Sequence, residues 1–350
     1  MRLFYCACIA LASGCSDYGV RSFDQVPDLG PDGTDGPPPV EGVVTLGGVR
    51  GRICGPSGDS WVSGATVRVE HAEGVAETLT DGNGWFIVDG IPTGTVDVVI
   101  TKGSFLTVFQ VDVVEGQIAD LPQEECIEQG DVSIAVLTGA YDHIQEILGH
   151  VGLAYDEING VQAASSLSLL RDPNRMAQYD VLFFNCGMSD AWLDHDTEVA
   201  QNLRTFVENG GSIYASDWSY YLVEASFRDQ NSFAGNDFEP GSAYVGATGT
   251  VQANVLDPSM QQLLGSNQAV INYDLDSWAA MVSADNATTL IEGPYEYYTG
   301  DFWGGTETRF APLASRFQYG QGTVIYTSFH NEQQTTFDMD LLLQDIVLSL

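Results

Sequence analysis

Short stretches of alternating apolar and polar residues occupy the chain from residue 42 to residue 122. Val49-Arg50-Gly51-Arg52-Ile53 and Ala65-Thr66-Val67-Arg68-Val69 show this alternation, and the runs Trp85–Val88 and Val96–Ile100 repeat it. Turn-forming residues such as Asp81-Gly82-Asn83-Gly84 separate the runs. A period of two with frequent turns is typical of antiparallel strands that bury one face. We therefore expect a small antiparallel β-sandwich over residues 42–122.

The pattern changes after residue 130, where continuous apolar runs alternate with segments of helical spacing. The expected strands, each with an apolar centre, are Val132–Leu137, Tyr179–Asn185, Ser212–Ala215 and Gly322–Thr327. Between them, apolar residues recur three and four positions apart, first after Asp142, the expected helix N-cap, and again before Asn209-Gly210-Gly211. Strands that alternate with helices form a parallel sheet with right-handed crossovers. The chain is thus expected to be multidomain, with a doubly wound, flavodoxin-like α/β domain over residues 130–350.

The first residues have the features of a compressed secretory signal. One cation, Arg2, precedes an apolar run and small residues that end at Cys15. Ala12-Ser13-Gly14-Cys15 resembles a bacterial lipobox, which implies a signal peptide over residues 1–14 and a diacylated Cys15 as the first mature residue. Ordinary secretion is the alternative. Residues 15–41, rich in Asp, Gly and Pro, are expected to form an acidic, extended tether. The expected location is the cell envelope, with the exported protein anchored by lipid at the outer membrane or cell surface.

The charge balance limits the partners. The chain has 12 Lys and Arg residues against 48 Asp and Glu, a formal net charge of −36. Such a surface repels phosphate backbones, so nucleic acid is excluded as a partner. Anionic lipid headgroups are repelled by this surface for the same reason. The membrane is therefore expected as a partner only through the N-terminal lipid. With 44% hydrophobic and 11% aromatic residues, most of the chain can fill folded cores.

Removal of the signal and lipidation of Cys15 leave three cysteines, Cys54, Cys126 and Cys186. Cys54 opens the sandwich and Cys126 follows its last strand, so a disulfide between them would tie the two ends of the domain together. Cys186 would then be unpaired. The chain has no CxxC motif and no cluster of Cys and His at ligand spacing, so neither a metal site nor a cofactor is expected.

Several sandwich segments resemble the carboxypeptidase regulatory-like domain, a transthyretin-like family. The segments are Gly51–Ile53, Val62–Val67, Thr80–Phe86 and Ile91–Thr95. In that family these residues build turns and a core, which implies a stabilising, spacing or weakly binding module here. No H-E-x-x-H zinc-peptidase motif accompanies the resemblance.

The α/β part resembles the class I glutamine amidotransferase-like superfamily, including its trehalose-utilisation-protein branch. The matching segments are Tyr179–Gly187, Val207–Gly211 with the strand that follows, and Gly322–His330. In the superfamily the strand after the Gly-Gly turn leads to a nucleophile elbow, and a late His-x-Glu supplies a base and its orienting acid. His330-Asn331-Glu332 stands at the position of that His-x-Glu. Ser216-Asp217-Trp218 stands at the elbow, with no cysteine and with Trp218 where a tight turn favours glycine.

This mismatch at the elbow determines the expected function. We expect a non-catalytic, lipid-anchored envelope protein that binds a small polar ligand or a glycan in a pocket near Ser216, Asp217, Trp218, Tyr220 and His330. One alternative is a serine-type hydrolase in which His330, oriented by Glu332, activates Ser216. A second alternative is a purely structural surface lipoprotein.

Other residues that can carry chemistry are expected to have structural roles. Cys186 is a second candidate nucleophile, but it ends a different strand and is expected to be a buried structural cysteine. His195 lies between two aspartates and is interpreted as part of an acidic loop. The aromatic run Tyr295–Trp303 contains the rings and carboxylates of a carbohydrate platform, although core packing explains such rings equally well. Its interleaved polar residues indicate a surface loop.

Overall fold

The computed structural model describes residues 45–121, 125–189, 197–235, 243–300, 304–331 and 335–350. The expected signal peptide and tether, Cys15, His195 and Glu332 lie outside these ranges. The chain from Val44 to Leu350 forms one compact unit. No helix in the described ranges combines the length and the apolar character needed to cross a membrane.

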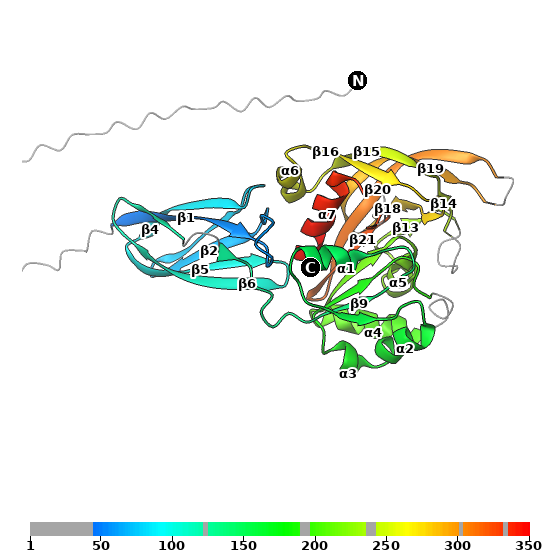
Figure 1. Ribbon diagram of the computed structural model, residues 1–350, viewed down its shortest axis with the longest axis horizontal. Helices are drawn as coiled ribbons and strands as arrows, with labels where there is room; N and C mark the ends of the chain where they lie inside the picture. The colour runs from blue at the N-terminus through cyan, green and yellow to red at the C-terminus, as the bar shows by residue number, and fades with distance from the viewer. Residues whose placement is uncertain (1–44, 122–124, 190–196, 236–242, 301–303, 332–334) are drawn as a thin grey trace, which may run out of the picture. The chain divides into compact units, whose positions relative to one another are not determined.

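The amino-terminal part of this unit is a sandwich of two sheets (Figure 1). One sheet is antiparallel throughout and contains, in spatial order, β3 (Gly74–Leu79), β2 (Thr66–His71), β5 (Gly94–Lys102) and β6 (Phe105–Val113). The other centres on β1 (Leu46–Cys54), which is antiparallel to β4 (Trp85–Pro92) and parallel to the short strands β7 (Ile118–Asp120) and β8 (Glu125–Cys126). Alternate residues such as Val67, Val69 and Val98 are fully buried between the sheets. The small sandwich expected from the alternating pattern is therefore present.

A disulfide joins Cys54 and Cys126, the pair that the sequence indicated. The two half-cystines lie opposite each other where β1 pairs with β8. They are 72 residues apart in the sequence. Closing a loop of that length stabilises the fold by about 4 kcal/mol, because it removes chain entropy from the unfolded state.

The carboxyl-terminal part is built on five parallel strands. Their spatial order is β10 (Asp156–Ile158), β9 (Ile134–Leu137), β11 (Val181–Phe184), β12 (Ser212–Ser216) and β21 (Gly322–Thr327). Since β9 precedes β10 in the chain, the order of these strands is 2-1-3-4-5, which is the flavodoxin-like arrangement. The expected doubly wound α/β fold is confirmed.

Alternate residues of the parallel strands belong to two separate cores. Val136, Phe183 and Ile325 pack in one core with helices α1 (Ile144–His150) and α7 (Phe337–Leu348). Leu182, Ile213 and Tyr326 pack in the other, with α2 (Ala163–Leu170), α3 (Pro173–Met176), α4 (Thr197–Glu208) and α5 (Tyr220–Ser226). Successive side chains of a strand point to opposite faces, so strands with helices on both sides need apolar residues at every position. This explains the continuous apolar runs in the sequence.

An antiparallel extension, which the sequence pattern did not predict, continues the sheet beyond β21. The long strands β20 (Thr306–Tyr319) and β19 (Thr288–Tyr298) follow β21 in antiparallel order. The remaining elements of the extension are β13 (Ser232–Phe233), β14 (Val245–Gly246), β15 (Gly249–Val255), α6 (Pro258–Leu264), β16 (Gln268–Tyr273), β17 (Trp278–Ala279) and β18 (Met281–Ser283). Tyr295 and Tyr297, expected in a surface loop, are instead buried on one face of β19. The loop prediction was wrong for these residues.

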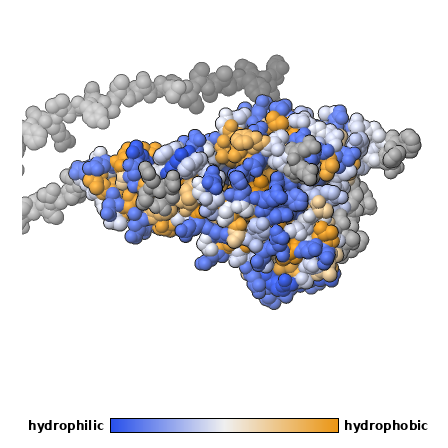
Figure 2. All heavy atoms as spheres, viewed as in Figure 1, coloured by the Kyte–Doolittle hydropathy of each residue, from blue (hydrophilic) through white to orange (hydrophobic). Residues whose placement is uncertain are grey.

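Hydrophilic residues cover most of the face drawn in Figure 2, and apolar residues lie among them in small groups. On the sandwich, exposed apolar side chains stand on the outward faces of β3 and β6, at Val75, Leu79, Leu106 and Val108. These positions alternate with buried or half-buried ones, as expected for strands with one solvent-facing side.

Candidate functional site

A pocket of about 310 Å³ opens beyond the carboxyl ends of the parallel strands. Cys186 follows β11, Asp217 follows β12 and His330 follows β21, and all three line the pocket. Other parts of the wall come from the antiparallel extension and α7, through Tyr273, Trp278 and Met339. Ligands in open α/β sheets bind outside the carboxyl ends of the strands, so this pocket is the candidate site.

The chain turns sharply at Asp217, directly after β12. Asp217 has a φ of 45°, and a short 3-10 helix, η2 (Asp217–Ser219), and then α5 follow it. Aspartate enters this left-handed region more readily than most residues with a side chain. Trp218 comes after the turn, so its bulk does not obstruct it. A strand, a strained residue and a helix in this order form the geometry of a nucleophile elbow. The expectation that Ser216-Asp217-Trp218 cannot build a tight elbow was wrong, and the apex is Asp217.

Backbone strain is concentrated at this pocket. Within the part of the chain that the structure describes, two residues other than glycine have a positive φ, Asp217 at 45° and Ser277 at 82°. Both line the pocket. Such conformations cost on the order of 1–3 kcal/mol each and cluster at functional sites. The strain is therefore a second observation, beside the pocket itself, that marks this region.

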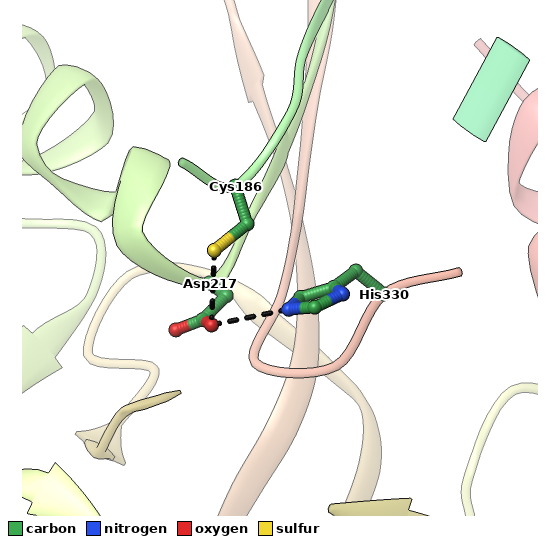
Figure 3. A group of neighbouring side chains, drawn as sticks. All are labelled: Cys186, Asp217 and His330. Atoms are coloured by element: carbon green, nitrogen blue, oxygen red, sulfur yellow. Dashed lines mark hydrogen bonds and ion pairs between the residues drawn. The ribbon is translucent and has the colours of Figure 1, made fainter. Parts of the chain in front are cut away.

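Three side chains meet in the pocket (Figure 3). Oδ2 of Asp217 accepts a hydrogen bond from Sγ of Cys186 at 3.2 Å and lies 3.2 Å from Nε2 of His330. Oδ1 of Asp217 accepts a hydrogen bond of 2.7 Å from the backbone N–H of Ala279 in β17. All three side chains are buried. Three ends of parallel strands thus bring a thiol, a carboxylate and an imidazole together.

The thiol of Cys186 is not activated. Burial raises its pKa well above the ordinary value, and the neighbouring Asp217 carboxylate raises it further. A backbone hydrogen bond from Trp218 lowers the pKa and does not offset these effects. The protonated thiol donates to Asp217, whereas a nucleophilic cysteine needs the thiolate.

Ser216 is engaged away from the pocket. Its hydroxyl donates a hydrogen bond of 2.5 Å to Oδ2 of Asp142 and accepts one of 3.0 Å from the backbone N–H of Cys186. Asp142 also accepts a hydrogen bond of 3.3 Å from the backbone N–H of Asn331. The N-cap of α1 is His143, so the expectation that Asp142 caps this helix was wrong. Burial raises the pKa of the Asp142 carboxyl above its ordinary value.

The structure places the expected ligand-binding residues in two groups. Asp217, Trp218 and His330 line the pocket, whereas Ser216 and Tyr220 are not part of its wall. Tyr220 is buried in α5, where its hydroxyl accepts a hydrogen bond from the backbone N–H of Ala243. The hydrogen bonds that Ser216 makes within the described ranges go to Asp142, Cys186 and Phe184 rather than to His330. Glu332, the third residue of the hydrolase alternative, lies outside those ranges.

Sequence reasoning missed the aromatic and acidic residues that the extension contributes. The rings of Tyr273 and Trp278 stack with their centroids 4.1 Å apart. The hydroxyl of Tyr273 forms a hydrogen bond of 2.7 Å with the hydroxyl of Ser328. Asp274 and Asp276 add two carboxylates to the wall. The available signal was the mixture of rings and acids from Tyr273 to Trp278, the same pattern that was noted in Tyr295–Trp303.

Residues 48–123 match the family model of the carboxypeptidase regulatory-like domain. The match spans the sandwich strands from β1 to β7. The sandwich is therefore a carboxypeptidase regulatory-like domain, as its turn and core segments implied. No curated protein matches the chain.

Solved structures similar to the chain include three bacterial proteins. A cold-adapted β-galactosidase from Rahnella sp. R3 is 17% identical over 62% of this chain and 31% of its own, with a TM-score of 0.35. A cytoplasmic protein from Salmonella typhimurium is 13% identical over 73% of this chain and 95% of its own, with a TM-score of 0.38. PurLQS from Thermotoga maritima is 11% identical over 62% of this chain and 98% of its own, with a TM-score of 0.38. The chain spans less than a third of the β-galactosidase.

Proposed function

We propose that this protein binds a small polar ligand, such as a neutral sugar unit of a glycan, in the pocket that Asp217, Trp218 and His330 line. The proposal includes a non-catalytic role and a lipid anchor in the cell envelope. The observation that carries it is the pocket of about 310 Å³ at the carboxyl edge of the sheet, whose wall combines aromatic rings with a carboxylate and an imidazole. Small-molecule pockets typically have this volume and a few convergent polar groups among apolar walls.

The charges of the wall favour a ligand rich in hydroxyl groups. The carboxylates of Asp217, Asp274 and Asp276 accept hydrogen bonds and repel anions. The net charge of −36 also disfavours an anionic ligand. Trp218 supplies a flat apolar ring, against which the C–H face of a sugar can pack. A neutral or cationic polyhydroxylated compound meets both requirements.

The state of the polar groups supports binding without catalysis. Both oxygens of Asp217 accept hydrogen bonds, Cys186 holds its proton, and Ser216 is bonded to Asp142. A nucleophilic enzyme needs an activated nucleophile beside a base. Neither Cys186 nor Ser216 is in that state.

A lipid on Cys15 would hold the protein at the envelope, with residues 16–41 as a spacer. The support is the apolar run and the small residues before Cys15, which lie outside the described ranges. Cys15→Ala should release the protein from the membrane fraction or leave an unprocessed precursor. Unchanged fractionation of this variant would contradict the anchor.

A glycan array followed by calorimetry on the purified protein tests the binding proposal. We expect affinity for neutral saccharides, with a loss of at least about tenfold in Trp218→Ala and Asp217→Asn, since each variant removes one contact of the wall. Trp85→Ala is the matched control, because this tryptophan is half exposed on the sandwich strand β4. A blank array, or equal affinities in all variants, would count against a saccharide site here.

A hydrolase is the second candidate, and the position of Asp217 at the elbow apex beside His330 favours it. Such an enzyme would use Asp217 rather than Ser216. A carboxylate oxygen of Asp217 would attack an electrophilic carbon and expel the leaving group, and water deprotonated by His330 would then hydrolyse the resulting ester. A covalent adduct on Asp217 that accumulates in His330→Ala would establish this reaction and overturn the non-catalytic role.

A further inference from the structure

We propose that Cys186, Asp217 and His330 form a binding site for one divalent transition metal ion, with zinc as the reference ion. The fourth coordination position would face the pocket. This inference departs from the expectation of no metal site, because the three residues come from three distant segments that only the folded sheet brings together. It stands on the geometry of the cluster and does not depend on sugar binding.

The donor set is of the kind that zinc binds. Zinc in proteins takes thiolate sulfur, imidazole nitrogen and carboxylate oxygen, in tetrahedral geometry. One ligand atom from each of the three residues lies within 4.8 Å of the others. In catalytic zinc sites, unlike structural ones, three protein ligands hold the ion and a fourth position is left for water or substrate. All three residues line the pocket, so such a position would be accessible from it.

The two distances to Asp217 are close to those around a tetrahedral ion. With zinc–sulfur bonds of about 2.3 Å and zinc–nitrogen and zinc–oxygen bonds of about 2.0 Å, neighbouring ligand atoms are roughly 3.3–3.5 Å apart. Oδ2 of Asp217 lies 3.2 Å from Sγ of Cys186 and 3.2 Å from Nε2 of His330. The third pair, Sγ of Cys186 and a ring nitrogen of His330, lies within 4.8 Å and would close to the tetrahedral separation around the ion. Because Oδ2 faces both partners, it is the oxygen that would bind.

Charge balance also favours the metal. A divalent ion with the Cys186 thiolate, the Asp217 carboxylate and a neutral His330 sums to zero, which suits a buried site. Binding would release the thiol proton to solvent, since a coordinating thiol is deprotonated outright. The surrounding acidic surface raises the local concentration of cations.

Groups around the cluster hold the ligands in place. The backbone N–H of Ala279 fixes Oδ1 of Asp217, which leaves Oδ2 directed at the other two residues. The hydroxyl of Ser216 fixes the backbone of Cys186 and is itself held by Asp142. Such outer contacts orient the ligands in metal sites.

Titration with cobalt(II), a spectroscopic substitute for zinc, tests the proposal. The protein is the full chain with Cys6, Cys8 and Cys15 replaced by serine, so that Cys186 is the only thiol outside the disulfide. We expect one cobalt ion per chain, a thiolate-to-cobalt charge-transfer band, intense visible bands of four-coordinate cobalt, and displacement of the cobalt by zinc.

Variants separate this site from adventitious binding. Cys186→Ser should abolish the charge-transfer band, and His330→Ala and Asp217→Asn should weaken binding by at least about tenfold. His150→Ala, which removes an exposed histidine of α1, should leave the spectrum unchanged. Circular dichroism confirms that each variant is folded.

Two results would overturn the metal site. One is the absence of the cobalt spectrum from the folded parent protein, and the other is an identical spectrum in Cys186→Ser. In either case the cluster is a hydrogen-bonded triad. Saccharide binding that persists in the presence of a chelator would then leave the proposed function intact, so the two proposals fail separately.

Discussion

The hydroxyl of Ser216 donates a hydrogen bond of 2.5 Å to Oδ2 of Asp142, 74 residues earlier in the chain. The same hydroxyl accepts from the backbone N–H of Cys186. One buried side chain at the end of β12 therefore ties together the segments that follow β9 and β11. This contact engages the hydroxyl of the residue that the hydrolase alternative uses as its nucleophile.

Ser216→Ala should destabilise the fold without removing the pocket. The change leaves Asp142 without one donor and the Cys186 N–H without its acceptor, which costs about 1–3 kcal/mol of unfolding free energy. Because Ser216 is not in the pocket wall, ligand affinity should change far less than in Asp217→Asn. Urea unfolding and calorimetry on the two variants measure both effects. Lost binding with unchanged stability in Ser216→Ala would place the serine in the site after all.

The pH dependence of stability should contain a contribution from Asp142. The pKa of Asp142 is raised in the folded protein, so the folded protein keeps this proton to a higher pH than the unfolded chain does. In an unfolded chain an aspartate has a pKa of about 3.9. The contribution of this proton to the free energy of unfolding is fully present below the unfolded pKa, and it is lost as the pH rises through the folded pKa. Asp142→Asn has no proton to lose, so its stability relative to the wild type should improve as the pH rises from about 4 through the folded pKa of Asp142.

Urea midpoints of the wild type and Asp142→Asn across this range measure the effect. Asp59→Asn is the control, because it removes one exposed carboxylate from the same acidic surface. A constant difference between Asp142→Asn and wild type at all pH values would contradict the assignment.

Removal of the disulfide should cost about 4 kcal/mol of unfolding free energy, through the entropy of the opened loop. The variant to compare with the oxidised wild type replaces both Cys54 and Cys126 by alanine, because a single replacement would leave a lone buried thiol. Its urea midpoint should equal that of the reduced wild type. If reduction leaves the wild-type midpoint where it was, the bond does not stabilise the fold.

The parallel core could be predicted from the sequence because its strands are buried on both faces. The centres of the runs Tyr179–Asn185 and Gly322–Thr327, Val181–Phe184 and Val324–Tyr326, are apolar throughout, and such stretches between helical segments have few other interpretations. The sandwich was predictable because its strands alternate and its turns contain glycine. The expected pocket near Asp217 and His330 lies at the carboxyl edge of the sheet.

The elbow and the shortest strands of the extension were beyond this reasoning for physical reasons. The pairing of Ser216 with Thr327 continues β12 by one residue, which moves the turn to Asp217. Aspartate can adopt a positive φ, so the absence of glycine did not exclude the turn. Strands of two residues, such as β14 and β17, are too short to leave a periodic pattern. The contact between Cys186 and Asp217 depends on the alignment of two strand ends, which no local pattern encodes.

Lys102, the only lysine of the chain, should behave as one half of a buried ion pair. Its Nζ lies 2.8 Å from Oδ1 of Asp345 in α7, and the two side chains are 7% and 4% exposed. Loss of one partner leaves an uncompensated buried charge, so Lys102→Met should cost about 3–5 kcal/mol of unfolding free energy. The double variant Lys102→Met with Asp345→Leu should recover most of that loss, because an apolar pair of similar volume needs no desolvation.

A double-mutant cycle by urea unfolding measures the coupling between the two residues. Arg50→Met supplies the control, since the ion pair of Arg50 with Asp120 is exposed at 51% and 63% and is screened by solvent. Its stability should change far less than that of Lys102→Met. If the two single variants and the double variant of the buried pair are equally stable, the pair is not coupled. The stability of the β5–α7 contact would then rest on its apolar neighbours alone.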